Sequence, residues 1–579
     1  MRDSLYRVDR DTLAHCVARC FGAQPHRCVG LLHHAAPAQP ACRAPASRVE
    51  SSIVRRTPCP SIVTDRRHLL KLATAAATTL WLPRSGWGQL HAATDPFALG
   101  VASGSPRHDG VVLWTRLLAP AGTAAVTVQW EVAHDEAFAR IAGRGQAQAL
   151  PELGHAVHVE VPALEPDRVY FYRFMAGGAT SPMGRTRTTP APDAAVQRLR
   201  LAYASCQRWE HGYYSAWRHM RADDPDYVVF LGDYIYEYPN AQGAVRFPDG
   251  GWALTLDGYR RRYALHRSDA DLRAMHAACP WFVTWDDHEV QNDYAGLTAG
   301  NGGPAVAGFA ERRAAAYQAF YEHMPLRSGA LTRALQGLAT GAELRIHGQA
   351  SFGRLASLYL LDARQYKDPQ VCTRDGKPGS SYVDPATCPA WDDPKRSMLG
   401  AAQEAWLDGA LAQGSRGWNL IGQQSVFGAR DARPGPDRFL WNDGWDGYGA
   451  ARTRLTDSLR RHAVANPVFL GGDVHENWVG HVKADYAMPA SPAVGVEFCG
   501  TSITSRAGGD NSKLAARLAA NPHFVFADTE KRGYGLVDLT PSRLTATLRV
   551  VDDVTRADAS ASTLAQFAVT AGRPAVEKA

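Results

Sequence analysis

Six apolar runs between residues 198 and 472 each end in polar or ionisable residues, and this repeated pattern constrains the fold more than any other feature. Short apolar runs of this kind are typical of buried strands. Longer helical segments such as 308–326 alternate with them, which predicts an α/β or layered sandwich domain. The runs are RLRLAYA (198–204), YVVFLG (227–232), WFVTW (281–285), LASLYLL (355–361), GWNLIG (417–422) and PVFLGG (467–472).

Side chains of metal-ligand type follow four of these runs. In open α/β sheets the functional crevice lies outside the carboxyl ends of the strands, so we expect the six runs to belong to one sheet and these side chains to line one site at its edge. Several carboxylates in one crevice raise one another's pKa unless a multivalent cation compensates their charge. The sequence therefore predicts a metal centre. The candidate residues are Cys206, Asp233, Tyr236, Asp287, His288, Asp473 and His475.

The mixture of ligand types indicates more than one kind of ion. Thiolate and phenolate ligands suit ferric iron, whereas carboxylates suit Ca²⁺, Mg²⁺ or Mn²⁺. The spacing of Cys and His is wider than in typical zinc sites, so the pattern favours a mixed site over a lone zinc.

Each motif taken alone also has an ordinary structural interpretation. A Gly-Asp pair after a strand is often a turn, Asp473-x-His475 can be a helix N-cap beside a surface histidine, and Cys206 can be a small buried hydrophobe. The repeated position at strand ends is what favours a shared site. Within TWDDHEVQND we expect Asp287 to be the ligand. The other acidic residues, Asp286, Glu289 and Asp293, are expected to support it or to lie at the surface.

The chain divides into regions of different character. Residues 95–190 contain short, alternating, Val- and aromatic-rich runs, which predict a small N-terminal β-sandwich. Residues 188–197 read as a linker, and residues 198–556 form the larger domain that carries the candidate site. The C-terminal residues 557–579 are expected to form a lid or a frayed tail.

The N-terminal 93 residues resemble a targeting region. Residues 64–93 contain the pair Arg66–Arg67, a mild apolar stretch and small residues at a possible cleavage point, as in twin-arginine signals. This predicts export by the twin-arginine translocase to the periplasm or the exterior; a short amphipathic helix is the alternative. Residues 1–63 are expected to be an unstructured leader, or to precede the true start.

Charge and hydropathy exclude two classes of partner. The formal net charge is +6, but its basic excess lies in the first 93 residues, and the rest of the chain is close to neutral. The folded part therefore shows no cationic surface for nucleic acid. No stretch approaches the ~20 apolar residues of a membrane span, and the sequence indicates no oligomeric state.

The cysteines suggest one disulfide. Five of the ten cysteines lie after residue 200, and Cys372 and Cys388 flank a polar loop that an exported protein could close with a disulfide. An odd number leaves at least one thiol unpaired, and Cys206 is the candidate.

Five motifs in order resemble the signature of the PhoD-type alkaline phosphatase family of calcineurin-like metallophosphoesterases. The resemblance covers roughly residues 95–550 and includes the N-terminal stretch 97–117. It implies a four-layer α/β/β/α catalytic core preceded by a small N-terminal β-domain. The motifs are SCQ (205–207), FLGDYIYE (230–237), TWDDHEVQND (284–293), LDARQYK (361–367) and GGDVHENW (471–478).

The resemblance also implies a ligand set. Fe³⁺ would be held with Cys206, Asp233 and Tyr236, and Ca²⁺ would lie at the carboxylate-rich side, with Asp233 bridging metals. Asp287 stands where the wider superfamily has Asn, and Asp473 and His475 occupy the two ligand positions of its last motif. The superfamily's Val-x-x-His motif has no obvious counterpart, and the region of Gln423 and Gln424 is the nearest candidate.

The implied activity is hydrolysis of phosphate mono- and diesters by a metal-activated hydroxide. Asp233 would take part through the metals, and His288 would protonate or orient the leaving oxygen. Arg364 and Asn292 would grip the phosphate, although a structural salt bridge is an equal alternative for Arg364. There are two rival hypotheses. One is an exported, non-catalytic binding protein in which the metal ions only stabilise the fold, and the other is a metallo-oxidoreductase. Monoesters, diesters, phospholipids and wall polymers all remain open as natural substrates.

Overall fold

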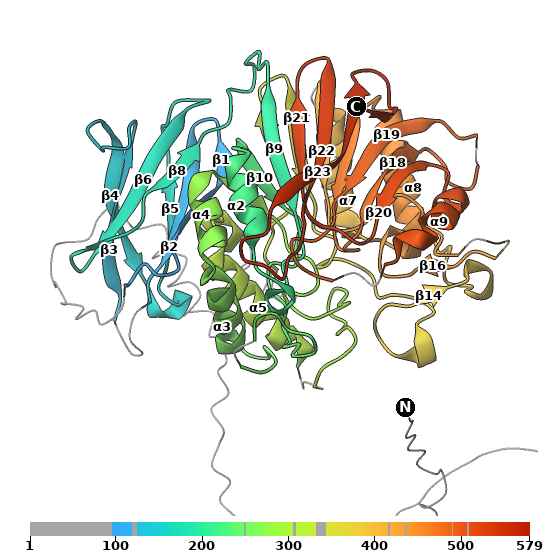
Figure 1. Cartoon of the computed structure of the whole chain (residues 1–579), viewed down its shortest axis with the longest axis horizontal. Coiled ribbons are helices and arrows are strands. Elements are labelled where there is room, and N and C mark those ends of the chain that lie inside the picture. The colour runs from blue at the N-terminus through green and yellow to red at the C-terminus, as the bar shows by residue number, and fades with distance from the viewer. Residues whose placement is uncertain are drawn as a thin grey trace, which may run out of the picture. The chain divides into compact units, whose positions relative to one another are not determined.

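The computed structural model describes most of the chain after residue 94. The predicted leader (1–63) and twin-arginine signal (64–93) lie outside the described residues. Two large β-sheets lie at the centre of the described part (Figure 1). The described ranges are 95–118, 124–247, 250–304, 308–331, 343–414, 417–433, 435, 437–488, 490–506 and 509–579.

The larger sheet has ten strands in the order β24-β23-β22-β21-β9-β10-β11-β1-β2-β5. Its central strands β9, β10 and β11 are parallel, so their carboxyl ends lie at the same edge. In chain order the strands are β1 (Val101–Arg107), β2 (Gly110–Arg116), β5 (Ala156–Val161), β9 (Leu199–Ala204), β10 (Tyr227–Phe230), β11 (Trp281–Val283), β21 (Arg532–Leu539), β22 (Arg543–Val551), β23 (Ala561–Thr570) and β24 (Glu577–Lys578).

The second sheet has seven strands in the order β12-β13-β15-β17-β19-β18-β20. Strands β13, β15, β17 and β19 are parallel neighbours, which again brings carboxyl ends to one edge. The strands are β12 (Gly348–Phe352), β13 (Ala356–Leu360), β15 (Trp418–Gly422), β17 (Pro467–Gly471), β18 (Asn477–Lys483), β19 (Ala493–Cys499) and β20 (Phe524–Asp528).

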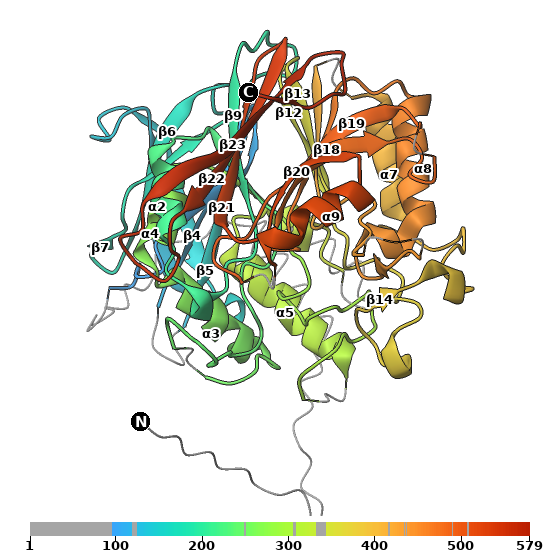
Figure 2. The same ribbon diagram turned by 45° about the vertical axis from the view of Figure 1, so that its right-hand side comes forward.

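The two sheets pack face to face and helices cover their outer faces (Figure 2). Leu201 and Val229 of the ten-stranded sheet share an apolar core with Leu420 and Leu470 of the seven-stranded sheet. This confirms the predicted four-layer α/β/β/α arrangement. One outer layer contains α2 (Ser215–Ala222), α3 (Leu256–Arg267), α4 (Ala270–Ala278) and α5 (Phe309–His323); the other contains α7 (Gly400–Ala412) and α8 (Gly449–Arg461).

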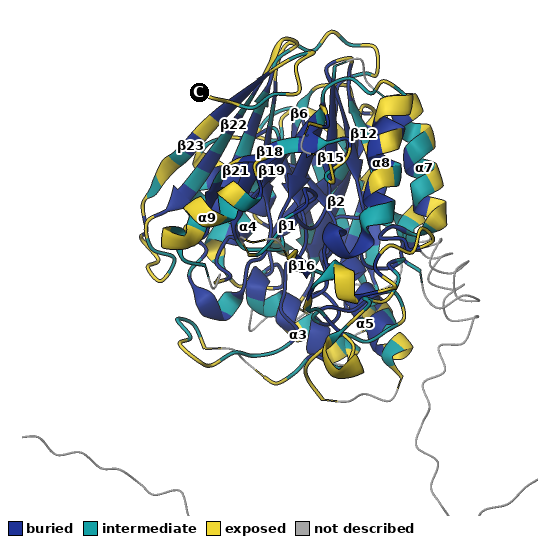
Figure 3. Cartoon of the chain, turned by 90° about the vertical axis from the view of Figure 1, so that its right-hand side faces the viewer, coloured by how far each residue is buried: buried dark blue, intermediate teal, exposed yellow. Residues whose placement is uncertain are grey.

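Burial follows these layers (Figure 3). The central strands β10, β11, β13, β15 and β17 are buried throughout, whereas α7 and α8 alternate between buried and more exposed residues as helices on an outer face should. Leu407 of α7 and Leu455 of α8 point into the core, whereas the exposed positions are small residues in α7 and mostly charged residues in α8. The short helix α9 (Leu514–Ala520) packs beside β20.

The N-terminal β-region also contains two facing sheets, but one of them is part of the central sheet. Strand β1 pairs with β11 in parallel, so β1, β2 and β5 extend the ten-stranded sheet. Leu113 of β2 packs against Val132 and Tyr172 of the other sheet. That sheet contains β3 (Val126–Ala133), β4 (Ile141–Ala149), β6 (Val169–Ala176), β7 (Ala179–Thr180) and β8 (Gly184–Arg187).

Two sequence expectations need correction. The six apolar runs are strands, as predicted, but they belong to two sheets, with β9, β10 and β11 in one and β13, β15 and β17 in the other. Residues 561–570 form strand β23 along β22, so this part of the tail is neither a lid nor a frayed end. Its first half, in which Ala and Ser flank Thr563 and Leu564, gives only a weak strand pattern, and pairing with β22 supplies the backbone hydrogen bonds.

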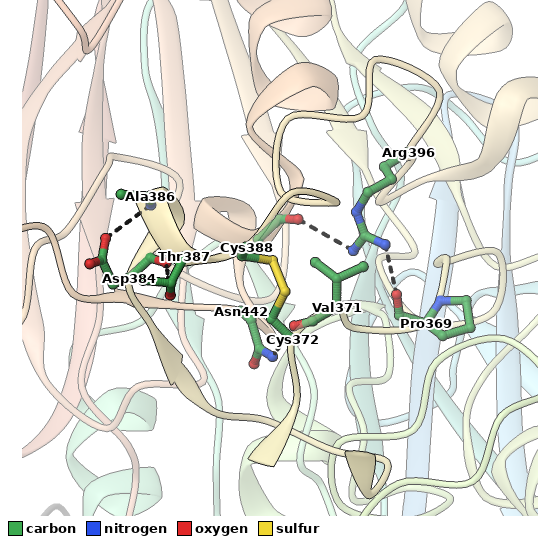
Figure 4. Close-up of a disulfide and its surroundings, with 10 residues drawn as sticks. Pro369, Val371, Cys372, Asp384, Ala386, Thr387, Cys388, Arg396 and Asn442 are labelled. Atoms are coloured by element: carbon green, nitrogen blue, oxygen red, sulfur yellow. Dashed lines mark hydrogen bonds between the residues drawn. A yellow bond between two sulfur atoms is a disulfide. The ribbon is translucent and has the colours of Figure 1, made fainter. Parts of the chain in front are cut away.

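A disulfide joins Cys372 and Cys388, as predicted (Figure 4). It closes a loop beside the short strands β14 (Tyr382–Val383) and β16 (Leu440–Trp441), which pair with each other. Among the described cysteines, Cys206, Cys279 and Cys499 are unpaired and buried. None of the described helices is both long enough and apolar enough to span a bilayer.

Candidate metal centre

The predicted ligands lie where strands of both sheets end. Four of them adopt left-handed backbone conformations, with φ of 59° at Cys206, 58° at Asp233, 65° at Asp473 and 56° at His475. Such conformations are uncommon for residues with a side chain and tend to cluster at functional sites. The chain turns sharply at each of these strand ends, and the side chains meet between the sheets.

Ligand atoms gather in three adjoining groups, each with its atoms within 4.8 Å of one another. Neighbouring groups share a residue: Asp233 belongs to the first and second, and Asp287 to the second and third. The site is therefore one continuous row of potential ligands. The groups are Cys206–Asp233–His475, Asp233–Asp287–His288 and Asp287–Asp293–Asp443.

Tyr236 completes the first group. Its hydroxyl donates to Asp233 Oδ2 at 3.0 Å and lies 3.2 Å from His475 Nε2 and 2.6 Å from Ser505 Oγ. His475 Nδ1 lies 2.8 Å from the carbonyl oxygen of Arg506. Because a carbonyl only accepts, Nδ1 carries the proton and Nε2 is left as the ligand atom, an arrangement common for metal-binding histidines.

The electrostatics of the site favour bound cations. Burial raises the pKa of the Cys206 thiol well above its usual value, and the carboxylate of Asp233 adds to the effect. Burial likewise raises the pKa of Asp233. The buried atoms Asp286 Oδ2 and Asp287 Oδ1 have no hydrogen-bond partner among the described residues. A donor set of thiol, phenol, imidazole and partly unsatisfied carboxylates fits a mixed metal centre, since cations would compensate the anionic forms.

Comparison with known proteins decides the family. A family model described as PhoD-like phosphatase matches residues 201–548, and one described as PhoD-like phosphatase, N-terminal domain, matches residues 83–190. This chain belongs to the PhoD-like phosphatase family. The predicted resemblance is therefore confirmed, and the chain is a hydrolase of phosphoric ester bonds.

Two PhoD proteins show how far the likeness extends. Alkaline phosphatase D of Bacillus subtilis (strain 168) is 43% identical over 485 residues, which cover 82% of this chain and 80% of that protein. A solved structure titled "Structure of PhoD" superposes with a TM-score of 0.78 at 41% identity, covering 84% of this chain and 93% of that one. The fold and the family thus agree over most of the described residues.

In this PhoD-like phosphatase, His288 lies within the ligand row. Its backbone N–H donates to Asp233 Oδ1 at 3.3 Å, and its Nδ1 lies 2.7 Å from Glu237 Oε2. Burial lowers the pKa of His288, but Asp287, Glu237 and Asp233 outweigh burial and raise this pKa well above its usual value. These three carboxylates thus favour the protonated form of the imidazole, which lies against Glu237.

Arg364 is buried at the opposite side of the row and is paired with carboxylates. It donates to Asp286, donates to Asp443 Oδ2 at 2.7 Å and lies 3.7 Å from Asp287 Oδ2. These contacts agree with the salt-bridge interpretation of Arg364, and phosphate binding stays a prediction.

Asn292 borders the same PhoD-like site and is partly exposed. Its backbone N–H donates to Glu237 Oε1 at 2.8 Å, and its side-chain amide donates to Asn301 Oδ1 at 2.8 Å. The side chain is thus oriented by Asn301, and its contact with a phosphate also stays a prediction.

The structure adds residues that sequence reasoning missed. Asp443 follows the short strand β16, with no long apolar run to mark it. Asp293, which we expected to be a supporting or surface charge, is buried and belongs to the third ligand group. The acidic positions of TWDDHEVQND could have indicated Asp293, whereas no local signal marks Asp443 or Ser505.

Other polar residues of the motifs have structural roles. Glu289 accepts backbone hydrogen bonds from Asp233, Tyr234 and Asp286, so it fixes the two turns that present the ligands. Gln424 donates to Thr284 Oγ1 and to two backbone oxygens, which ties the ends of the two sheets together. The side-chain amide of Gln424 is therefore used to join the sheets, and Gln424 does not take the ligand role of the histidine in the Val-x-x-His motif.

Asp473, the last predicted ligand, approaches the row from β17. Its Oδ2 accepts from Ser425 Oγ at 2.7 Å, and its charge acts on the pKa of Cys206. Burial raises the pKa of Asp473, and Arg364 opposes this shift. Asp473 belongs to none of the three ligand groups, and only its charge acts on Cys206 of the ten-stranded sheet.

Proposed function

We propose that this PhoD-like phosphatase is an exported, metal-dependent enzyme that hydrolyses phosphate mono- and diesters. The observation that carries the proposal is the continuous row of three ligand groups between the two sheets. Non-catalytic binding, the main alternative from the sequence, does not fit membership of a phosphatase family.

The ligand types divide the row between two kinds of metal. Cys206, Asp233, Tyr236 and His475 would hold Fe³⁺, because thiolate and phenolate suit a hard ion of high charge. The carboxylates of Asp287 and Asp473 would hold Ca²⁺. Asp293 and Asp443, which the sequence reasoning did not select as ligands, would join them. Ions bound there would activate water and stabilise the negative charge of the reacting phosphate.

His288 and Arg364 would act on the substrate. The protonated imidazole of His288, held by Glu237, can donate a proton or a hydrogen bond to the leaving oxygen. Arg364 would place positive charge beside the phosphate while its carboxylate partners hold it in position. The side-chain amide of Asn292 would add a neutral contact to the same group.

Export is supported by the sequence. The pair Arg66–Arg67 and the following apolar stretch predict recognition by the twin-arginine translocase. A disulfide between Cys372 and Cys388 fits an oxidising compartment. The periplasm or the exterior is therefore the proposed location.

Turnover of chromogenic esters tests the proposal. We expect metal-loaded protein to hydrolyse p-nitrophenyl phosphate and bis(p-nitrophenyl) phosphate. Asp233→Asn should lower kcat/KM more than about 100-fold, because even residues that only orient ligands contribute about 10–100-fold. Asp538→Asn is the matched control, since Asp538 pairs with Arg198 near the opposite end of β9.

Two results would overturn the proposal. The first is no turnover of either ester by protein that contains both metals. The second is equal turnover by Asp233→Asn and Asp538→Asn, because the ligand row would then take no part in the reaction.

A further inference from the structure

Three neighbouring aromatic rings, two of them stacked and the third tilted, form a small surface on the two-stranded sheet of β14 and β16. We define this ring platform as Tyr382, Phe439 and Trp441. The rings of Tyr382 and Phe439 are nearly parallel, with centroids 5.2 Å apart, and the centroid of Trp441 lies 4.7 Å from that of Tyr382. Tyr382 is 43% exposed, and Phe439 and Trp441 are partly exposed.

The ring platform is next in sequence to residues of the candidate metal centre. Tyr382 pairs with Trp441 in the two-stranded sheet. Ser380 and Asp443 each lie two residues beyond this pair, at the same end of the sheet. Ser380 donates to Asp293 Oδ2 through its N–H at 3.0 Å and its hydroxyl at 2.6 Å, and Asp443 belongs to the third ligand group.

An apolar core anchors the two-stranded sheet of β14 and β16. Val383 and Leu440 pack with Cys388 and Trp391 in a small apolar core, beside the disulfide shown in Figure 4. Asn442 is completely buried; its Oδ1 accepts from the N–H of Ser381 at 2.6 Å and its Nδ2 donates to the Val371 carbonyl at 2.9 Å. The apolar core and the hydrogen bonds of Asn442 thus hold the strands that carry the rings in a fixed position.

Charges of both signs lie beside the rings, since Asp431 and Asp437 alternate with Arg433 and Arg438 in the segment before Phe439. The guanidinium of Arg433 lies 3.8 Å from the centroid of the Phe439 ring, and the neighbouring Arg438 is exposed. An exposed aromatic stack next to a polar site offers flat apolar area to a ligand whose charged part lies in that site.

We propose that the ring platform binds a planar aromatic ring carried by the alcohol of the phosphoester, such as the base of a nucleotide. The phosphate would lie at the ligand row while the ring stacks on Tyr382. This inference rests on the phosphoesterase function proposed above and adds a substrate class to it: esters of ring-bearing alcohols are preferred to esters of small alcohols.

Three esters of primary alcohols separate the ring from the leaving-group chemistry: adenosine 5′-monophosphate, ribose 5-phosphate and ethyl phosphate. We expect the highest kcat/KM, measured by phosphate release, for adenosine 5′-monophosphate. Tyr382→Ala should lower that value roughly two- to tenfold, the range expected for one aromatic pair, and leave the other two esters unchanged. Tyr382→Phe should retain the preference, because it keeps the ring.

Equal losses for all three esters in Tyr382→Ala, or a wild-type enzyme without preference, would overturn this inference alone. Calorimetric titration of the metal-loaded protein with phosphonate analogues of the same three esters, in which a methylene group replaces the ester oxygen, reports binding without turnover. Tighter binding of the adenosine analogue that is lost in Tyr382→Ala would support the ring platform even if no ester were hydrolysed, which would count only against the proposed function. Equal affinity for the three analogues would again overturn the inference.

Discussion

Asp233 adopts a left-handed conformation that residues with side chains seldom adopt, and so do Cys206, Asp473 and His475. Such residues cost of the order of 1–3 kcal/mol each and persist where their surroundings hold them. Here Glu289 accepts the N–H groups of both Asp233 and Tyr234. These left-handed conformations lower the stability of the fold locally. They are retained because they place the ligand atoms between the sheets.

Tyr236 allows a test at the scale of one oxygen atom. Its hydroxyl touches Asp233, His475 and Ser505, so Tyr236→Phe removes the proposed phenolate ligand and keeps the ring. We expect iron-loaded wild type to show a visible phenolate-to-Fe³⁺ band that the variant lacks, and kcat/KM to fall at least about tenfold. Absorption spectra and ester turnover measure both effects.

Tyr238→Phe is the control, because Tyr238 lies two residues away and stacks on Trp252. It should keep the visible band and most of the activity. An unchanged band in Tyr236→Phe would contradict the assignment of the phenolate.

Glu497 of β19 predicts a pH effect on stability away from the ligand row. Burial raises its pKa from 4.5 to about 7, although the N–H groups of Phe427 and Gly428 oppose the shift. The folded state therefore binds a proton between these pH values that the unfolded state has released. The stabilisation is complete below pH 4.5 and is lost as pH rises through 7, by on the order of 3 kcal/mol.

Urea unfolding at pH 5 and pH 8 checks this effect. Wild type should lose on the order of 3 kcal/mol more stability than Glu497→Gln over this interval, because glutamine does not titrate. The same pH dependence in both proteins would show that Glu497 keeps its usual pKa.

At the residue scale, the sequence indicated the candidate ligands that closely follow buried apolar runs. Cys206, Asp233 and Asp287 are examples, because a buried apolar run before each marks the position. Asp443 and Ser505 could not be found in this way. Their proximity to the row depends on contacts between segments far apart in the chain, which no local pattern records.

At the scale of elements, two triplets of parallel strands build the site. The apolar runs predicted all six strands, but not that β9, β10 and β11 lie in a different sheet from β13, β15 and β17. Each run is buried on both faces, so its pattern is the same in either sheet. Pairing between distant strands decides the sheet, and only the family resemblance indicated two facing sheets.

The disulfide loop supports the acidic end of the row. Gln370 and Ser380 of this segment donate to Asp293 and Asp443, and the disulfide closes a separation of 16 residues. Replacing Cys372 and Cys388 by serine should raise the Ca²⁺ concentration for half-maximal turnover about tenfold, because the loop orients carboxylate ligands. It should also cost roughly 3 kcal/mol of stability.

Calcium titrations of turnover measure the first effect. Ser380→Ala should raise the Ca²⁺ requirement in the same direction without removing the disulfide, and so separates orientation from global stability. An unchanged Ca²⁺ requirement in both variants would show that the loop does not support the site.

At the scale of the whole described part, the N-terminal β-region and the catalytic layers share a sheet. Besides the β1–β11 pairing, the buried Trp114 donates to the Glu322 carbonyl of α5 at 3.0 Å, and Arg116 lies 3.1 Å from His323 Nε2. The alternating strands of 95–190 were evident in the sequence. Their continuity with the central sheet was not, because it depends on one parallel pairing across about 180 residues.

The central claim is that both sheets contribute to one metal centre that hydrolyses phosphoesters. Its most direct test is elemental analysis of the full chain combined with ester turnover, for wild type, Asp287→Asn of the ten-stranded sheet and Asp473→Asn of the seven-stranded sheet. We predict iron and calcium in the wild type, and a joint loss of bound metal and of activity in each variant. Full activity in metal-free wild type, or full metal content and activity in both variants, would contradict the account.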